Sequence, residues 1–442
     1  MKLFKKLFVI ALILAAAFSA SGFSYDLSLT PVEIPGLPGI HSFAYAQHDG
    51  KWLIIGGRTD GLHARQPGRS FPAQYNNTVI HVIDVQSRSL NSASSDSLPP
   101  SLQEHLQTTN MNFFQDGDIL YYLGGYAYSD SARDHITFPY LTAVHVPGLI
   151  KAVEMGTELS VHMKQIRDER FAVTGGQLGK LGDTFLLVGG HRFDGRYNPV
   201  GPLHGPGFSQ EYTQEIRTFR IHHDSTTIAV SDYQVMRDEA HLHRRDFNLV
   251  GQIFPDGSPG YMISAGVFQK EADLPFLYPV FVSLEGYEPI EQFSQLLSHY
   301  HGAKAAAYDQ ETGDMHSLFF GGISQYYYQD GNLVKDDRVP FVRTISRVTR
   351  SADGSLAEYV FPLEMPGFLG ASAEFLVNYH LPVSSNGVIL LHQVSGDVFA
   401  IGHILGGIES PLENPFSTNR THLTGASNTV YEVKLLRKPS ER

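Results

Sequence analysis

The stretch RFAVTGGQLGKLGDTFLLVGGH, residues 170–191, decides the fold of this chain. We expect two strands joined by a tight turn. The first begins at residues 171–173 and continues to the turn Leu181-Gly182-Asp183, and the second is Thr184–Val188. The second strand runs into the pair Gly189-Gly190. Short apolar runs bounded by glycines indicate buried strands rather than helices.

The same pattern occurs six times along the chain. The copies are HDGKWLIIGG ending at Gly57, DGDILYYLGG ending at Gly125, LGDTFLLVGG ending at Gly190, SPGYMISAG ending at Gly266, TGDMHSLFFGG ending at Gly322 and SGDVFAIGHILGG ending at Gly407. A third strand is expected after each copy, at residues 78–85, 141–146, 215–221, 278–284, 344–348 and 429–435. A weaker fourth strand follows in most copies. Six repeats of four strands predict an all-β, six-bladed β-propeller.

The chain resembles the kelch propellers in its Gly-Gly ends and in third strands such as NTVIHVID, residues 77–84. Arg170 also stands where kelch repeats often carry an arginine. The resemblance covers nearly the whole mature chain and implies one propeller domain over residues 23–442. The chain departs from the family in lacking the tryptophan usual later in each repeat, since it has one Trp. We expect residues 25–30 to pair with the last strand and complete the sixth blade, which would remove an exposed sheet edge.

The first 22 residues have the pattern of a secretory signal peptide. Lys2, Lys5 and Lys6 precede an apolar run over residues 7–18, and small residues follow. We therefore expect an exported protein, periplasmic or extracellular, with no membrane span in its mature part. The absence of cysteine excludes disulfides. The net charge of −12 argues against nucleic acid as a partner. The oligomeric state stays open.

In the predicted propeller, the loops between second and third strands share one face with the connections between blades. These loops are long, at residues 58–77, 126–140, 191–214, 324–340 and 408–428, whereas the turns at the other face are predicted to be short. Long loops on a rigid scaffold are typical binding sites. The expected ligand-binding residues on this face are His41, His105, Arg170, His191, Arg192, His243, Arg245, Tyr300 and His301.

A regular spacing supports part of this set. His105, Arg170 and His301 each lie 13 residues before a turn aspartate, Asp118, Asp183 and Asp314 respectively. We interpret the three as equivalent positions at the mouth of the axial channel. The alternative is that such residues form hydrogen bonds between neighbouring blades.

Two kinds of chemistry are possible at this face. His243 and His301 could hold a transition metal, the only cofactor the sequence suggests, because alternate residues of an extended segment point to the same side. Glu169 and Arg170 could act as an acid–base pair on a polar substrate. The alternative for the charged run of residues 167–170 is a solvated surface with weak ion pairs.

The sequence predicts a binding protein for a small polar or anionic ligand, a glycan or a protein partner on a His/Arg/Tyr-rich axial face. The alternative is an enzyme at the same place. It would be either a sugar mutarotase or isomerase, similar to the kelch-type sialate mutarotases, or a metal-dependent enzyme with histidine ligands. An oxidase resembling the galactose-oxidase type is excluded, because its Tyr–Cys crosslink needs a cysteine.

Overall fold

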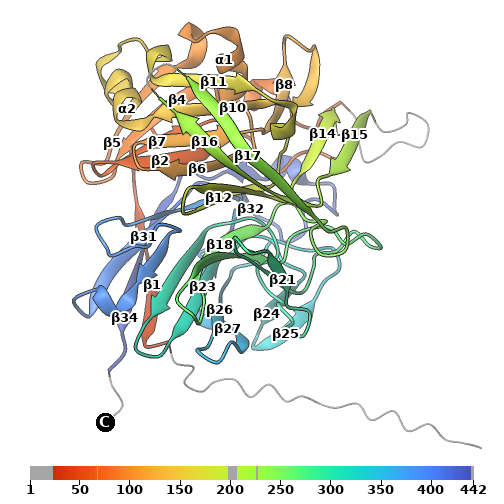
Figure 1. Cartoon of the computed structure of the whole chain (residues 1–442). Coiled ribbons are helices and arrows are strands. Elements are labelled where there is room, and N and C mark those ends of the chain that lie inside the picture. The colour runs from red at the N-terminus through yellow and green to blue at the C-terminus, as the bar shows by residue number, and fades with distance from the viewer. Residues whose placement is uncertain (1–22, 67, 198–206, 225–226, 440–442) are drawn as a thin grey trace, which may run out of the picture.

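The computed structural model describes residues 23–66, 68–197, 207–224 and 227–439. The predicted signal peptide lies outside the described residues. Over the described residues the protein is all-β. Six sheets each contain four antiparallel strands, four smaller sheets have two or three strands, and there are two short α-helices, α1 (Pro100–Leu106) and α2 (Val146–Met155). The sheets lie around a common centre in Figure 1.

The first three sheets follow one another along the chain. The first is β2 (Ala44–His48), β3 (Lys51–Ile55), β4 (Val79–Asp84) and β5 (Ser89–Ser94). The second is β6 (Asn112–Asp116), β7 (Ile119–Leu123), β10 (Tyr140–His145) and β11 (Met163–Arg167). The third is β12 (Gln177–Leu181), β13 (Thr184–Val188), β16 (Glu215–His223) and β17 (Ile228–Arg237).

The last three sheets differ in how they are completed. The fourth is β18 (Asn248–Ile253), β19 (Pro259–Ser264), β20 (Val280–Val282) and β21 (Tyr287–Pro289). The fifth is β22 (Lys304–Asp309), β23 (Asp314–Phe320), β26 (Thr344–Arg350) and β27 (Leu356–Glu364), with the extra strand β30 (Val388–Leu390) parallel to β22. The sixth is β29 (Glu374–Val377), β31 (Val398–Leu405), β34 (Val430–Arg437) and β1 (Tyr25–Val32).

The sixth sheet contains both ends of the described chain. β1 runs antiparallel to β34 over its full length, from Tyr25 opposite Arg437 to Val32 opposite Val430. In Figure 1 the red β1 lies beside the blue β34. This confirms the expected pairing of the N-terminal segment, and the third strands are also confirmed within one or two residues at most ends.

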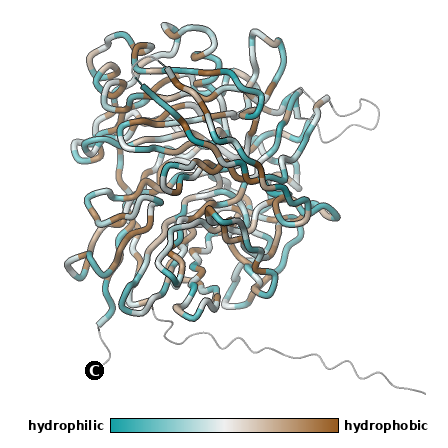
Figure 2. The backbone as a smooth tube through the Cα atoms, viewed as in Figure 1, coloured by the Kyte–Doolittle hydropathy of each residue, from teal (hydrophilic) through white to brown (hydrophobic). Residues whose placement is uncertain are grey.

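The hydropathy and burial of a strand depend on its position in the sheet. In the first three sheets the second strands are largely apolar runs, such as KWLII in β3 and TFLLV in β13, and every residue after the first is buried. The fourth strands are less buried, and SLNSAS in β5 is polar and largely exposed. In Figure 2 the brown, hydrophobic parts of the tube lie mainly along the inner strands. A strand with sheets packed on both faces buries every side chain, so it cannot alternate.

The hydrophobic core is divided among the gaps between successive sheets. One cluster, for example, joins Leu53 of the first sheet to Leu120 of the second. Equivalent clusters join the second sheet to the third, the third to the fourth, the fourth to the fifth and the fifth to the sixth. A further cluster joins Leu376 of the sixth sheet to Ile54 of the first. Each sheet is therefore packed between two others.

Five Gly-Gly pairs and, in the fourth copy, the pair Ala265-Gly266 connect each sheet to the next. The second residue of every pair donates a backbone hydrogen bond to a carbonyl that precedes the next sheet, and Gly407 of the sixth sheet donates to Ile40, which precedes the first. The six bonds, 2.8–3.1 Å long, run from Gly57 to Thr108, Gly125 to Val173, Gly190 to Arg244, Gly266 to His299, Gly322 to Leu369 and Gly407 to Ile40.

A second cycle of hydrogen bonds surrounds the centre, and we call it the axial ring. Each of its six residues donates its N–H to the carbonyl of the ring residue before it, and Ser42 donates to Ser372 to complete the cycle. The distances are 2.7–3.1 Å. The ring residues are Ser42, Asn110, Gly175, Asp246, His301 and Ser372.

Two expectations from the sequence are corrected. The first strand of the third sheet is Gln177–Leu181 and does not begin at residues 171–173. There Glu169–Phe171 form a 3-10 turn, which places Phe171 in the core between two sheets. The connection between the first two strands of the sixth sheet is also not short: it runs from residue 378 to residue 397 and contains β30.

Candidate functional site

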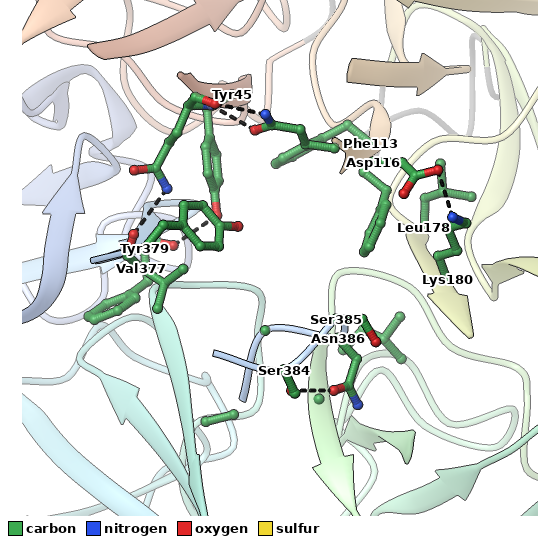
Figure 3. Close-up of a pocket in the computed structure, with 18 of the residues that line it drawn as sticks. Tyr45, Phe113, Asp116, Leu178, Lys180, Val377, Tyr379, Ser384, Ser385 and Asn386 are labelled. Carbon is green, nitrogen blue, oxygen red and sulfur yellow. Dashed lines mark hydrogen bonds and ion pairs between the residues drawn. The ribbon is translucent and has the colours of Figure 1, made fainter. Parts of the chain in front are cut away.

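A cavity of about 740 Å³ lies at the centre of the six sheets. All six innermost strands contribute to its wall, with Tyr45 from β2, Phe113 from β6 and Lys180 from β12 among the lining residues. In Figure 3, Tyr45 and Tyr379 lie on one side of the open space and Asp116 and Lys180 on the opposite side. The volume is within the range of pockets that hold small molecules.

The cavity reaches the surface at one end. Its lining includes the exposed turn residues Asp49, Gly117 and Gly182, which join first to second strands. We call this end of the sheets the turn face and the opposite end, with the long loops, the loop face. Toward the loop face the space narrows to about 10 Å³ beside the axial ring, where Asn110, Asp246 and His301 are among the lining residues. A volume near 10 Å³ holds one water at most.

Polar side chains in the cavity wall cover the open edges of the innermost strands. The Gln115 side chain accepts from the N–H of Gln47 at 2.7 Å and donates to its carbonyl at 2.7 Å. The Tyr45 hydroxyl donates to the carbonyl of Phe375 at 2.9 Å. The Tyr261 hydroxyl accepts from the N–H of Lys180 at 3.0 Å and donates to its carbonyl. Backbone groups of an unpaired edge need such partners.

Two lysines in the wall are bound to carboxylates of the adjacent sheet. Lys180 Nζ lies 2.6 Å from Asp116 Oδ2, and Lys304 Nζ lies 3.8 Å from Glu374 Oε2. The other oxygen of Glu374 lies 3.0 Å from His301 Nε2. Burial opposes ionisation of Glu374, but Lys304 and His301 outweigh it and hold the pKa of this carboxyl below its usual value.

The long connection of the sixth sheet forms part of the cavity wall. β30 extends the fifth sheet beyond β22, at its inner edge. Asn386 fixes the segment, because its amide donates to the carbonyls of Gln252 at 2.9 Å and Gly260 at 2.8 Å. Ser384 and Ser385 line the cavity in Figure 3. This segment was not predicted from the sequence, where its only signal is a second apolar run, residues 388–391, close to the sixth repeat.

At the loop face, the long loops pack on one another. His63 stacks on Phe71 with ring centres 4.9 Å apart, and it also contacts Tyr197 and Phe416, which belong to the loops of the third and sixth sheets. Burial lowers the pKa of His63 to about 4. The Tyr126 hydroxyl donates to the carbonyl of Gly195 at 2.8 Å. These contacts join loops of different sheets at the face where the sequence predicts the binding site.

His105 lies in the core. Its Nδ1 is 2.8 Å from Thr142 Oγ1 and its Nε2 is 3.0 Å from the carbonyl of Gly124. Burial lowers its pKa to about 3, although the carbonyl of Gly124 acts in the opposite direction. His105 is therefore a structural residue, whose ring contacts β10 and the end of β7.

The shared 13-residue spacing does not mark equivalent places. Counted from the first residue of the innermost strand, His301 lies three residues before Lys304, whereas His105 lies seven before Asn112 and Arg170 seven before Gln177. The counts agree by coincidence, because β22 and its following turn are longer than their counterparts and because Asp314 is the first residue of β23, whereas Asp118 and Asp183 lie in turns. The position of His301 corresponds to Thr109 and Thr174.

His41 and Arg245 also occupy this position, three residues before their strands. His41 Nε2 lies 3.8 Å from Asp60, and burial lowers the pKa of its ring. Asp60 also accepts two hydrogen bonds, 2.8 and 2.7 Å, from the buried Arg58. The sequence analysis did not identify Arg58 or Asp60, although Arg58 directly follows a Gly-Gly pair, as His191 does.

Tyr212 brings three of the expected residues together. The His243 ring stacks on its ring at 3.9 Å, the Nε of Arg245 donates to its hydroxyl at 3.1 Å, and the His191 ring lies 5.7 Å away. Burial, and then the charge of Arg245, hold the pKa of His191 well below its usual value. Burial also raises the pKa of the Tyr300 hydroxyl, although the charge of Arg245 acts to lower it.

Glu169 lies at the surface, with 56% of its side chain exposed. It forms ion pairs with Arg167 at 2.9 Å and Arg192 at 3.1 Å, and the hydrogen bond from Arg167, then that from Arg192, hold its pKa below the usual value although burial opposes this. Arg170 pairs instead with Asp168 and covers the ring of Tyr233 at 4.3 Å. The pattern is that of a solvated ion-pair network.

Within the described residues, no group of three or more His, Cys, Asp or Glu side chains is arranged to hold a metal ion. His243 and His301 have separate partners, since His243 lies 3.0 Å from the Gln214 amide and His301 contacts Glu374.

No protein-family model and no curated protein sequence matches this chain. In the described parts of the chain, no helix has the length and apolar character needed to cross a membrane.

Proposed function

We propose that the six sheets form a closed, six-bladed β-propeller of the kelch-like type, with residues 23–442 as one domain. Three observations support a ring: the hydrophobic clusters between successive sheets, the hydrogen bonds of the Gly-Gly pairs, and the axial ring. In each set the sixth sheet contacts the first, as closure requires. The pairing of β1 with β34 would then complete the last blade.

We propose that this propeller is a binding protein for a small polar ligand, taken up in the central cavity from the turn face. The observation that carries the proposal is a 740 Å³ cavity that combines amide, hydroxyl and ionic side chains with aromatic rings. Cavities that bind small molecules have this composition. The proposal moves the site from the loop face to the other end of the same axis.

The enzyme alternatives receive less support. Glu169 is exposed and held in its ionised form by two arginines, whereas a general acid or base acts best when its pKa is near the working pH. For a metal-dependent reaction, the pair His243 and His301 would need at least one further protein ligand. A binding function needs neither.

The export of the protein remains part of the proposal, because it rests on residues 1–22. Described residues begin at Phe23, whose side chain is buried against His316 and Phe361. N-terminal sequencing of protein recovered outside the cytoplasm tests this point. We expect a mature chain that begins close to Phe23.

Cavity-filling variants test the binding proposal. Gln177 and Ser385 line the cavity, and tryptophan at either position would occupy its space. We expect Gln177→Trp and Ser385→Trp to abolish the thermal stabilisation produced by any polar small molecule that stabilises the wild type. Arg192→Ala, at the surface of the loop face, is the matched control and should keep the response. Equal responses in all four proteins would contradict a cavity site.

A further inference from the structure

The mouth of the cavity is acidic. Four aspartates lie at or beside the turns of the first three sheets: Asp49, Asp116, Asp118 and Asp183. Three of these residues are exposed, and 43% of the Asp116 side chain is exposed. Aspartates are negatively charged at neutral pH, and a cleft between walls of low dielectric concentrates the field of such charges.

The positive charges of the wall are largely neutralised. Lys180 and Lys304 are 18% and 15% exposed, and each is paired with a carboxylate. By contrast, no ion pair involves Asp49 or Asp183 among the described residues. His48, beside Asp49, faces Asp118 at 3.5 Å. The charge left over at the mouth is therefore negative.

Aromatic side chains also line the cavity. They are Tyr45, Phe113 and Tyr379, of which Phe113 belongs to the same strand as Asp116 and Tyr379 is 56% exposed. The face of an aromatic ring attracts a cation, with a benefit of about 0.5–2 kcal/mol that grows as the cation loses water. Carboxylates at the entrance together with rings inside would favour an ammonium group over a neutral or anionic group of the same shape.

We infer that the ligand of the central cavity is a small organic cation that carries an amine or a quaternary ammonium group. This inference rests on the proposed binding function and names the chemical class of its ligand. The carboxylates at the mouth attract the cation, and the rings of Tyr45, Phe113 and Tyr379 contact it inside. The sequence predicted a small polar or anionic ligand, a glycan or a protein partner, and the cationic ligand is proposed as an alternative to these.

The test compares choline with dimethylbutanol, the uncharged analogue in which carbon replaces the ammonium nitrogen, and with glucose. We expect calorimetry to show about tenfold tighter binding of choline than of its analogue, as cation–π contact and the acidic mouth together would give. Salt should weaken the binding of choline more than that of the analogue. Equal affinities, or binding of glucose alone, would overturn the inference.

Asp49→Asn is the most specific variant. It removes a charge at the mouth and leaves no cation unpaired, and asparagine tolerates the φ of +51° at this position. We expect the ratio of the affinity for choline to the affinity for dimethylbutanol to fall about threefold or more. Asp397→Asn, in the connection of the sixth sheet but outside the cavity lining, should leave it unchanged. If Asp49→Asn has no effect, the mouth does not select cations.

Binding to the cavity-filling variant distinguishes a failure of the proposed cavity site from a failure of the inferred cationic ligand. Choline that binds Gln177→Trp as well as wild type is not in the cavity, which would contradict the proposed function itself. Glucose that binds the wild type but not Gln177→Trp would leave the cavity as the site and reject only the cationic ligand. Absence of choline binding at millimolar concentration also rejects the cationic ligand.

Discussion

The N–H of Gly407 donates a 2.9 Å hydrogen bond to the carbonyl of Ile40, which joins the end of the sixth repeat to the segment before the first sheet. The equivalent bond occurs at each of the other five junctions between successive sheets. A local motif of the sequence, the Gly-Gly pair, is therefore also the place where the sheets are held together.

The first prediction concerns the Gly-Gly pairs. Gly124 has a φ of +67°, and a Cβ there would overlap the carbonyl oxygen of Val173, in the segment that precedes the next sheet. Gly124→Ala should lower the free energy of unfolding by about 3 kcal/mol or more, from backbone strain and displacement of the neighbour. Gly50→Ala is the control, because Gly50 has a similar φ of +74° but no atom within 4 Å of a Cβ. Its cost should be about 1–2 kcal/mol. Urea unfolding measures both, and equal losses would contradict a role in contact between sheets.

The second prediction concerns the N-terminal strand. Leu27 of β1 is buried in the core of the fifth and sixth sheets. Leu27→Ala should cost about 2–4 kcal/mol, since it leaves a cavity in the core. Asp26→Ala, at the exposed neighbouring position, should change stability by less than about 0.5 kcal/mol. Thermal unfolding distinguishes them, and an unchanged melting temperature for Leu27→Ala would mean that β1 is not part of the core.

The third prediction concerns acid stability. His105 has a pKa of about 3 in the folded protein, against about 6.5 in an unfolded chain. As the pH falls from 6.5 toward 3, only the unfolded state takes up a proton at this residue, so stability decreases by up to about 1.4 kcal/mol per pH unit. His299 and His316, with pKa values of about 4 and 3, act in the same direction.

In His105→Gln, the number of extra protons bound by the unfolded state should fall by about one. The free energy of unfolding should therefore depend less steeply on pH. The amide can still contact Thr142 and Gly124, so the variant should fold. Urea unfolding at neutral pH and about two pH units lower gives the slope for each protein. His380→Gln, at an exposed position, controls for histidine replacement in general. An unchanged slope in His105→Gln would show that His105 is not held neutral.

The fourth prediction concerns the ion pairs of Glu169. Because these side chains are exposed, Glu169→Gln should change stability by less than about 1 kcal/mol. It should also leave ligand binding unaltered, since the cavity opens at the other face. Loss of binding in Glu169→Gln, with stability preserved, would return the site to the loop face.

Much of the fold could be predicted because it depends on local signals. The glycine ends and the apolar second strands recur along the chain. Each repeat packs against the repeat before it and the repeat after it in the same way. The segment of residues 378–397 could not be predicted in this way, because its position depends on contacts such as Asn386 with Gln252, far away in the sequence.

The site was harder to predict than the fold. The sequence predicted His243 and Arg245 on one face, and both contact Tyr212 in the structure, but it could not show that the long loops pack together around His63. Glu374 of the cavity stands in an otherwise apolar strand, EFLV of β29. An inward-facing polar residue in such a strand is the signal that could have identified it.

A crystallographic fragment screen with small polar and cationic molecules tests the central claim most directly. The account predicts that bound fragments gather in the cavity between Tyr45, Tyr379 and Asp116, with the ammonium groups toward the carboxylates. Fragments bound only at the loop face, around Tyr212 and Arg245, would contradict it.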